Sequence, residues 1–415
     1  ARVADDIADS VDNVDRAMRW GYGWELGPFE LWDAIGVDNI LEACDISEPP
    51  PLIDKLISTT SQLDVPARLH RLRGEPLPFG HPDLSLLTQC KRSQSVVKQN
   101  PGASLVDLGD GVLAVEFHSK MNAIGGDTVE MLHAGVDEAQ KHFEGLVIGN
   151  ESPTFSAGAN LMLVLLEAQE GNWDEIELMV QSFQTAVLEL RYADIPVVVA
   201  PAGLTLGGGC EIALHGDGVQ AAAETYMGQV EVGVGLIPAG GGTTELLARS
   251  MKQQPSAIED SLPFVRQAFE LIGLAKVSTS APEAQQLGLL RPHDRISMNR
   301  ERIVSDAKQF VLDLARTGYQ PPKAPMIKVG GAGVRAGLEL GLHIAWRGGY
   351  ISDHDATIGR KLARILSGGN VAHPTTVSAQ HLLDLEREVF LSLCGEAKTL
   401  ERISHTLKTG KALRN

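Results

Sequence analysis

The stretch that decides the fold runs from 206 to 213 and reads Leu206-Gly207-Gly208-Gly209-Cys210-Glu211-Ile212-Ala213. An apolar segment runs here into three glycines and then into a helical pattern, which predicts a strand, a tight turn and a helix. The first turn of a helix presents unpaired backbone N–H groups and a partial positive charge, which together can hold an anion or a developing oxyanion. The stretch is not a nucleotide-binding P-loop, because no Gly-Lys-Ser/Thr follows the glycines.

A second glycine-rich run carries an acid and reads Gly228-Gln229-Val230-Glu231-Val232-Gly233-Val234-Gly235-Leu236-Ile237-Pro238-Ala239-Gly240-Gly241-Gly242-Thr243. Burial of Glu231 without a partner would raise its pKa and suit it to proton transfer, whereas the alternative makes it an exposed strand residue. Two carboxylates, Glu211 and Glu231, could share one water molecule beside the helix terminus. One would take the proton of the water while the other donates a proton to carbon, which is chemistry for adding water across an activated double bond.

A third stretch, Thr154-Phe155-Ser156-Ala157-Gly158-Ala159-Asn160, directly follows a predicted strand. Its small residues would let a ligand approach the backbone closely. The alternative is an ordinary turn between a strand and a helix.

The segments around these stretches alternate between strand and helix patterns. Two apolar runs, 105–108 and 112–117, flank Gly109-Asp110-Gly111 and predict a hairpin. The apolar runs 145–149 and 197–200 predict buried strands, and the spacing of apolar residues predicts helices around 129–139 and over 173–191. Strands that alternate with helices indicate the α/β class.

We divide the chain into four regions by pattern. Residues 1–60 are predicted to be helical, with Ile7, Val11, Val14 and Met18 at helical spacing and Pro28 in the first turn of a helix. Residues 61–104 show little periodicity and are interpreted as a linker. The α/β core takes 105–295, and 296–415 is predicted to be mostly helical, with segments at 303–315, 355–366 and 380–393.

The composition of the 415 residues excludes several classes of protein. Hydrophobic residues make up 43% and charged residues 21%, which is a globular balance. The net charge of −17 argues against nucleic acid as a partner, and no uncharged apolar run is long enough to predict a membrane span. The histidines lack metal-ligand spacing, so no metal is expected. A reducing cytoplasm is the expected location, since the cysteines are far apart and form no C-x-x-C pair: Cys44, Cys90, Cys210 and Cys394.

Taken together, residues from about 105 to 295 resemble the crotonase (enoyl-CoA hydratase/isomerase) superfamily, whose landmarks occur here in order. The segment His118-Ser119-Lys120-Met121-Asn122-Ala123-Ile124 is similar to the one that receives the CoA adenine. Residues 155–160 and 207–211 resemble the two oxyanion segments, 229–231 the second hydratase glutamate, 237–243 the glycine turn after it, and 281–290 a late helix and turn. The resemblance implies the ββα spiral core of that superfamily, with helical regions added at both ends.

The resemblance also implies roles for residues. The backbone N–H groups of Ala159 and Gly208 would hold the thioester oxygen, and Glu211 and Glu231 would hold and activate the water. In the usual assignment of the family Glu211 acts on the water and Glu231 protonates the α-carbon, a division that the sequence leaves open. Asn160 departs from the family, since many hydratases have Asp there. The expected substrate-binding residues are Lys120, Asn122, Ala123, Ala157, Gly158, Gly207 and Pro238.

The N-terminal region carries a second resemblance. The stretches Val14-Asp15-Arg16-Ala17-Met18-Arg19-Trp20-Gly21-Tyr22-Gly23 and Gly27-Pro28-Phe29-Glu30-Leu31-Trp32-Asp33 are similar to the helical C-terminal domain of 3-hydroxyacyl-CoA dehydrogenases. No strand-G-x-G-x-x-G-helix unit opens the chain. The chain therefore resembles the C-terminal portion of a bacterial β-oxidation fusion protein, whose NAD-binding domain would lie upstream.

These resemblances imply a lyase of fatty-acid β-oxidation that hydrates trans-2-enoyl-CoA to 3-hydroxyacyl-CoA. No cofactor is expected in this chain, because NAD would belong to the upstream domain. The expected partners are the acyl-CoA substrate, further copies of the chain in a homo-oligomer and the upstream dehydrogenase domain. Two alternatives stay open: an enoyl-CoA isomerase, for which one acid suffices, and a non-catalytic module that docks the dehydrogenase.

Overall fold

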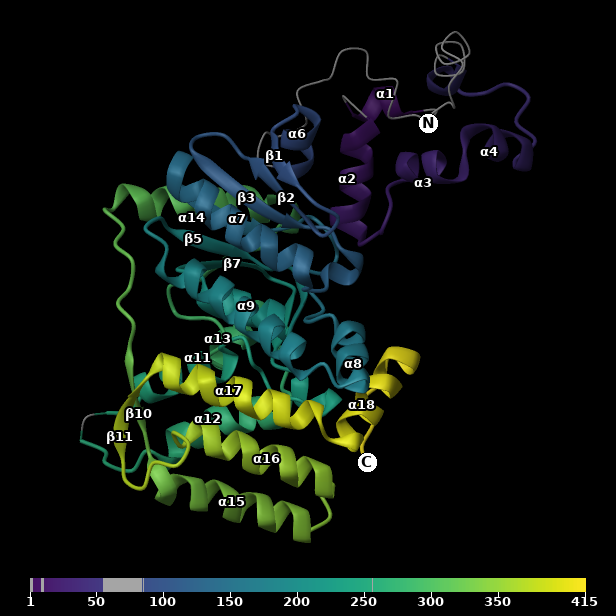
Figure 1. Cartoon of the computed structure of the whole chain (residues 1–415). Coiled ribbons are helices and arrows are strands. Elements are labelled where there is room, and N and C mark those ends of the chain that lie inside the picture. The colour runs from purple at the N-terminus through teal and green to yellow at the C-terminus, as the bar shows by residue number, and fades with distance from the viewer. Residues whose placement is uncertain (1–2, 9–10, 55–83, 85, 256) are drawn as a thin grey trace. The chain divides into compact units, whose positions relative to one another are not determined.

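The computed structural model describes residues 3–8, 11–54, 84, 86–255 and 257–415 (Figure 1). The chain divides into two compact units, 1–84 and 85–415, and each is described by itself. Within the described residues no helix combines the length and the apolar character that crossing a bilayer requires.

The first unit is helical in its described part, as the spacing of its apolar residues predicts. The helices are α1 (Ala4–Ile7), α2 (Val11–Tyr22), α3 (Pro28–Ile35) and α4 (Val37–Ala43). The buried carboxylate of Asp15 on α2 accepts hydrogen bonds from the backbone N–H groups of Phe29 (2.7 Å) and Glu30 (3.1 Å). It thereby satisfies two of the unpaired donors in the first turn of α3.

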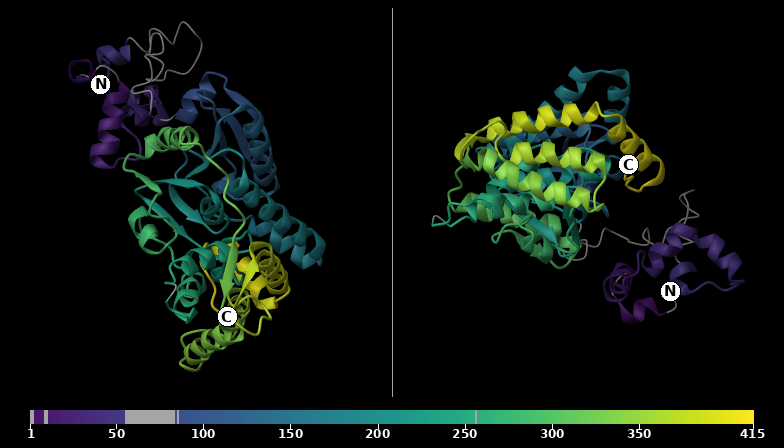
Figure 2. Two further views of the ribbon diagram at one scale, coloured as in Figure 1. Left: turned by 90° about the vertical axis from the view of Figure 1, so that its left-hand side faces the viewer. Right: turned by 90° about the horizontal axis from the view of Figure 1, so that it is seen from below.

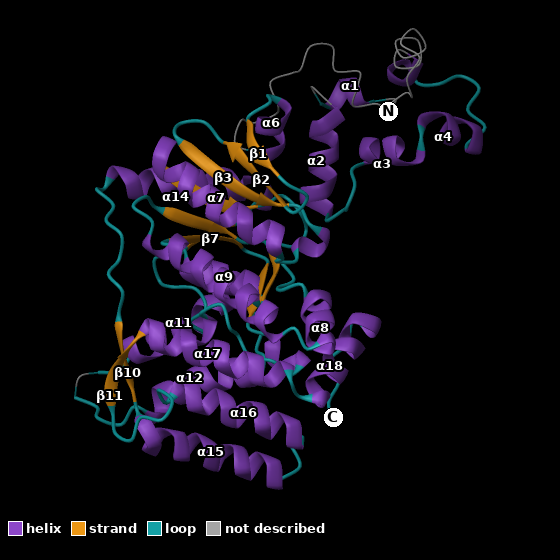
Figure 3. Cartoon of the chain, viewed as in Figure 1, coloured by secondary structure: helices purple, strands orange, loops and turns teal. Residues whose placement is uncertain are grey.

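The second unit is built on a seven-stranded sheet in the order β1-β2-β3-β4-β5-β7-β9 (Figure 3). The strands are β1 (Val96–Gln99), β2 (Ala103–Asp107), β3 (Val112–Phe117), β4 (Gly145–Gly149), β5 (Val197–Ala200), β7 (Gly218–Ala222) and β9 (Arg295–Ser297). The first three strands are antiparallel and the others are parallel. The predicted hairpin is confirmed, since Asp107 pairs with Leu113 across its turn. The predicted strands at 145–149 and 197–200 are also confirmed.

Helices cover both faces of this sheet, which explains why its central strands are apolar runs. Leu113 and Val115 of β3 face the cluster that includes α7 (Gly126–His142), whereas Val112 and Ala114 face the cluster that includes α14 (Ile303–Arg316). The remaining helices and 3₁₀ turns up to residue 302 are α6 (Leu86–Arg92), η2 (Lys120–Asn122), α8 (Leu161–Glu170), α9 (Trp173–Tyr192), α10 (Gly208–His215), η3 (Glu231–Val234), α11 (Gly242–Lys252), α12 (Leu262–Gly273), α13 (Ala281–Gln286) and η4 (Arg300–Arg302). The alternation of strands and helices confirms the α/β class.

A separate pair of short parallel strands brings the two glycine-rich stretches together. Strand β6 (Gly203–Leu206) pairs with β8 (Thr225–Gly228) so that Leu206 lies opposite Gly228. Because parallel strands in this register end at the same edge, the residues that follow them leave from neighbouring points. The N–H of Gly207 donates to the carbonyl of Gly228 (3.0 Å), which fixes that junction.

The region after residue 316 belongs to the same compact unit and gathers on one side of it (Figure 2). Its elements are β10 (Met326–Val329), α15 (Gly331–Arg347), α16 (Asp353–Leu366), β11 (Thr375–Ser378), α17 (Ala379–Cys394) and α18 (Ala397–Thr409). Helix α17 contacts α9 and α11, and α18 contacts α8 and η3. The three predicted helices of 296–415 are confirmed, whereas the β10–β11 pair was not predicted.

The structure corrects the linker prediction for 61–104. Helix α6, strand β1 and the start of β2 lie within that range, and the second unit begins at residue 85. Strand β1 is an edge strand with mostly exposed side chains, so it shows no apolar alternation in the sequence. The part of the predicted linker from 61 to 83 lies outside the described residues.

Candidate active site

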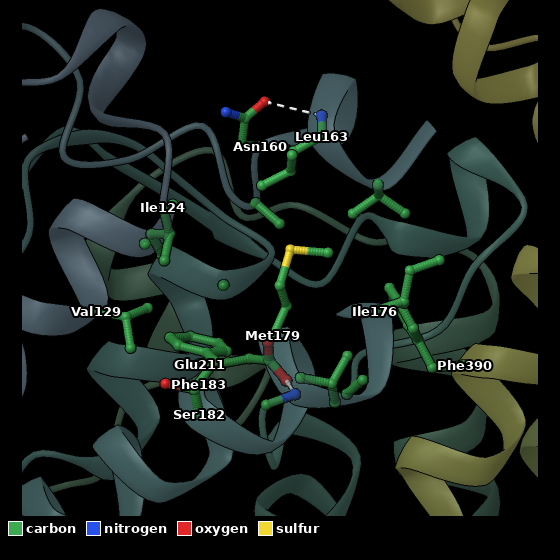
Figure 4. Close-up of a pocket in the computed structure, with 18 of the residues that line it drawn as sticks. Ile124, Val129, Asn160, Leu163, Ile176, Met179, Ser182, Phe183, Glu211 and Phe390 are labelled. Carbon is green, nitrogen blue, oxygen red and sulfur yellow. Dashed lines mark hydrogen bonds between the residues drawn. The ribbon is translucent and has the colours of Figure 1, made fainter. Parts of the chain in front are cut away.

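A cavity of about 470 Å³ brings together the four residues to which the sequence assigns chemistry (Figure 4). Its walls include Ala159, Gly208, Glu211 and Glu231. These residues come from the loop before α8, from α10 and from η3, so segments far apart in the chain meet here. The described residues contain no cluster of His, Cys, Asp or Glu arranged to bind a metal ion.

Two backbone N–H groups at the cavity lack acceptors. Ile124 bridges the 154–160 stretch through the carbonyl of Gly158 and the N–H of Asn160 (both 2.9 Å), which leaves the N–H of Ala159 outside the bridge. Gly208 begins α10, so its N–H has no partner within the helix. Within the described part of the chain neither N–H donates to another group. Both can therefore donate to an oxygen atom of a ligand.

Two glycines with positive φ let these segments approach each other. At Gly158 (φ +97°) a Cβ would lie 3.2 Å from the carbonyl oxygen of Leu206 and 3.7 Å from the nitrogen of Gly208. Gly207 has φ +52° and ψ −122°, which is a conformation for glycine alone, and a Cβ there would lie 2.9 Å from Oε1 of Glu231. The glycines therefore position the two N–H groups and also make room for the carboxylate of Glu231.

Glu211 is buried in the first turn of α10, with 3% of its surface exposed. Its Oε1 accepts hydrogen bonds from the N–H groups of Gly240 and Gly242, each at 2.8 Å. Burial raises the pKa of Glu211 to about 7, although the N–H groups of Gly242 and Gly240 favour the charged form. Near neutral pH this carboxyl can therefore lose or accept a proton readily.

Glu231 lies in the 3₁₀ turn η3 and lines the cavity, so the alternative of an exposed strand residue is wrong. Burial and the neighbouring charge of Glu211 hold the pKa of Glu231 well above its usual range. In the amide orientation that satisfies its polar atoms, Gln229 donates to both oxygens of Glu231, at 3.1 and 3.2 Å. Both carboxyls therefore hold a proton more tightly than an exposed glutamate does.

The rest of the cavity is mainly apolar and suits an acyl chain. Its apolar lining comes from α7, α8, α9 and α17 and includes Val129, Leu163, Val164, Ile176, Met179 and Phe390. Figure 4 shows Phe390 reaching in from the yellow ribbon of α17, in the C-terminal region. Asn160, the departure from the family, caps α8 by accepting a hydrogen bond from the N–H of Leu163 (3.4 Å).

Of the expected substrate-binding residues, Gly158 and Gly207 shape the backbone as described above. The side chain of Asn122 donates to Oγ of Ser152 and to the carbonyl of Thr154, both at 2.7 Å, and so ties two loops together. The structure places all seven expected contacts outside the residues that line the cavity: Lys120, which is exposed, Asn122, Ala123, Ala157, Gly158, Gly207 and Pro238. Their contact with substrate stays a prediction.

The sequence analysis missed another buried glutamate, Glu386 on α17. Its Oε2 accepts from the N–H of Gly241 (2.9 Å), and its Oε1 accepts from the N–H (2.7 Å) and hydroxyl (2.6 Å) of Thr244. Burial raises the pKa of Glu386 to about 8, although the Thr244 hydroxyl favours the charged form. A signal was present, because Glu386 stands at helical spacing from Leu382, Leu383, Val389 and Phe390 and so on the apolar face of its helix.

The C-terminal region also holds the turn that carries Glu231. Arg402 on α18 is 1% exposed, and its Nη1 lies 3.3 Å from the carbonyl oxygen of Val232 and 2.8 Å from Oδ1 of Asp355. The hydroxyl of Thr399 donates to the carbonyl of Gly235 (2.9 Å) at the end of η3. Both ends of η3 are therefore bonded to α18.

Comparison with known proteins identifies the family to which the chain belongs. Residues 107–256 match the family described as "Enoyl-CoA hydratase/isomerase". The mitochondrial methylglutaconyl-CoA hydratase of Mus musculus is 31% identical over 234 residues, which cover 56% of this chain and 67% of that protein. The chain belongs to the enoyl-CoA hydratase/isomerase family, and its second unit has the crotonase fold.

A bacterial relative matches the whole chain. The probable 3-hydroxyacyl-CoA dehydrogenase of Bacillus subtilis (strain 168) is 42% identical over 422 residues, which cover 100% of this chain and 53% of that protein. The chain thus spans about half the length of the curated relatives that match it from end to end. The crystal structure of enoyl-CoA hydratase from Bacillus halodurans matches with a TM-score of 0.50 and 17% identity, covering 73% of this chain and 99% of that chain, which bears on the fold alone.

Proposed function

We propose that the chain is an enoyl-CoA hydratase, which adds water to trans-2-enoyl-CoA and yields 3-hydroxyacyl-CoA. One observation carries the proposal: two carboxyls share an apolar cavity with two backbone N–H groups that lack acceptors. Addition of water to a conjugated thioester needs a base, an acid and a place for the negative charge, and the cavity offers all three.

In the proposed reaction, the N–H groups of Ala159 and Gly208 bind the thioester oxygen of the substrate. Negative charge grows on that oxygen as water adds, and one such donor is worth about 2.7–4 kcal/mol in other enzymes. The carboxylate of Glu211 takes a proton from the water molecule, whose oxygen bonds to C3 of the enoyl group. The carboxyl of Glu231 gives its proton to C2, and a proton passed from Glu211 to Glu231 restores both groups.

The base and the acid of the reaction need opposite protonation states at its start. A base must be ionised before the reaction, and we assign that role to Glu211, whose Oε1 accepts hydrogen bonds from the N–H groups of Gly240 and Gly242. An acid must hold its proton, and we assign that role to Glu231, whose pKa is raised by burial and by the neighbouring charge of Glu211. The presence of two carboxyls in one cavity supports hydration over double-bond isomerisation, because one acid suffices for isomerisation.

The relatives support a place in fatty-acid β-oxidation. The Bacillus subtilis relative is named a probable 3-hydroxyacyl-CoA dehydrogenase, and a 3-hydroxyacyl-CoA is the product of the proposed hydration. We propose that the whole protein joins the hydratase to a dehydrogenase, and that the NAD-binding part lies outside this chain. The hydration itself would use only the groups described above.

The test is to follow the loss of enoyl-thioester absorbance with crotonyl-CoA and with a longer trans-2-enoyl-CoA, and to identify the product by mass spectrometry. We expect formation of 3-hydroxyacyl-CoA from at least one of the two substrates. Conversion of a 3-enoyl-CoA without hydration of either substrate would favour an isomerase. Absence of any turnover by folded protein would instead favour a docking module.

A further inference from the structure

The glycine turn behind Glu211 is held from two sides by carboxyl groups. The N–H groups of Gly240 and Gly242 donate to Glu211, whereas those of Gly241 and Thr244 donate to Glu386. Successive N–H groups therefore point to opposite sides of the turn, toward two acids that come from different helices. Since the turn opens into the eleven-residue helix α11, both acids also lie near the positive end of its dipole.

The two sets of hydrogen bonds cannot change independently. Gly240, Gly241 and Gly242 are consecutive, so a rotation that withdraws the N–H of Gly241 from Glu386 also redirects its neighbours. The positive φ of Gly241 (+95°) shows that the turn adopts a conformation suited to glycine. The hydrogen bonds of Glu386 therefore help to keep the donors of Gly240 and Gly242 aimed at Glu211.

Helix α17 is fixed to the same turn by a second buried contact. Gln184 on α9 donates through Nε2 to the carbonyls of Ala239 (2.8 Å) and Leu383 (3.0 Å). Its Oε1 accepts from Nη1 of Arg387 (3.0 Å), the residue next to Glu386. The turn, α9 and α17 thus form one hydrogen-bonded unit, and Figure 1 shows α17 running beside α9.

We propose that Glu386 is a positioning residue for hydration, which acts on Glu211 through the 238–244 turn. The inference rests on the proposed function and deepens it, because it gives the C-terminal region a part in the chemistry. Glu386 does not line the cavity, so it does not touch the substrate. Its influence passes through backbone donors that fix the orientation of the Glu211 carboxylate and its affinity for a proton.

The groups around Glu386 agree with this assignment. The acids that act on it or feel its charge are Glu211 and Glu231, and the ring of His215 packs against Gly241, where a Cβ would lie 2.9 Å from it. Burial keeps the pKa of His215 low, at about 4, so its ring is neutral near pH 7. Within the described residues Glu386 forms no ion pair with a basic side chain, and backbone and hydroxyl donors satisfy it instead.

The experiment measures kcat and KM for crotonyl-CoA with Glu386→Gln in the full chain. Gln keeps the volume but replaces one acceptor oxygen with a donor, so the turn loses part of its support. We expect kcat to fall about 30-fold with KM unchanged, since small displacements of a catalytic group cost this much. Glu386→Asp should recover part of kcat. The matched control is Glu388→Gln on the exposed side of the same helix, which should behave as wild type.

A double-mutant cycle separates positioning from general stability. If Glu386 acts through Glu211, adding Glu386→Gln to a Glu211→Gln chain should change kcat by less than about twofold. Equal losses of kcat in both backgrounds, or wild-type kcat for folded Glu386→Gln, would overturn the inference. If Glu386→Gln does not fold, Thr244→Val replaces it, with an expected loss of about threefold in kcat from one hydrogen bond; wild-type kcat of that variant would likewise overturn it. Full turnover by Glu211→Gln would instead overturn the proposed function itself.

Discussion

The core at 105–295 and the C-terminal region at 296–415 contribute to the cavity in different ways. The core supplies every group that we assign to the chemistry, namely the N–H groups of Ala159 and Gly208 and the carboxyls of Glu211 and Glu231. The C-terminal region supplies groups that hold these in place, together with Phe390 in the lining of the cavity. The C-terminal region therefore adds hydrogen bonds to the two segments of the core that carry or position the carboxyls, the 238–244 turn and η3.

The largest expected effect comes from the acid of the core. Glu231→Gln should lower kcat about a thousandfold, because Gln cannot deliver a proton to C2 of the substrate. Binding of a saturated acyl-CoA, measured by calorimetry, should stay near the wild-type affinity. Glu224→Gln, at an exposed position between β7 and β8, serves as the control and should be fully active. Near-normal turnover of Glu231→Gln would remove the acid from the mechanism.

The next effect tests whether α18 in the C-terminal region stabilises η3. Arg402→Leu leaves Asp355 without its cation and frees the carbonyl of Val232, so the free energy of unfolding should fall by about 3 kcal/mol. Urea unfolding checks this change. Arg364→Leu breaks a more exposed pair with Glu388 and should cost less than about 1 kcal/mol. Equal costs for both variants would show that η3 does not depend on α18.

A glycine of the core gives the third effect. Gly207→Ala puts a Cβ 2.9 Å from Oε1 of Glu231 and forces alanine into strained backbone, so we expect kcat to fall about 100-fold. Gly318→Ala is the control: it has a similar positive φ and open space around its Cβ, far along the chain. It should lose stability without loss of turnover. A fully active Gly207→Ala would contradict the described packing of Glu231 on the turn.

The smallest effect is the dependence of the rate on pH. Glu211 must be ionised to act as the base, and its pKa is raised to about 7. The value of kcat/KM should therefore rise as the pH increases through about 7 and fall about tenfold per pH unit below it. A profile that is flat from pH 5 to pH 8 would rule out Glu211 as the base.

The comparison between the two regions also explains what the sequence could predict. In the core, a strand, a glycine turn and an acid follow one another within a few residues, so Gly207, Glu211 and Glu231 were found from local patterns. The resemblance to a known family added the N–H groups of Ala159 and Gly208. The structure shows that Ala159, Gly208, Glu211 and Glu231 line one cavity.

The contributions of the tail were not predicted, because they depend on contacts between distant parts of the chain. Glu386 meets the N–H of Gly241 across 145 positions, and Arg402 meets Val232 across 170. Beside Asp384, Arg387 and Glu388, an acid such as Glu386 looks like part of a charged surface. Glu386 differs from these neighbours only in its helical spacing, which places it on the apolar face of α17. The edge strand β1 was missed for a related reason, since its exposed side chains show no pattern.

The central claim is that the carboxyl pair of the core performs hydration. The most direct test compares the loss of crotonyl-CoA absorbance by the wild-type chain with that by the double variant Glu211→Gln/Glu231→Gln. The account predicts steady conversion to 3-hydroxybutyryl-CoA by the wild type and none above background by the folded double variant. Conversion by the double variant at the wild-type rate would contradict the account.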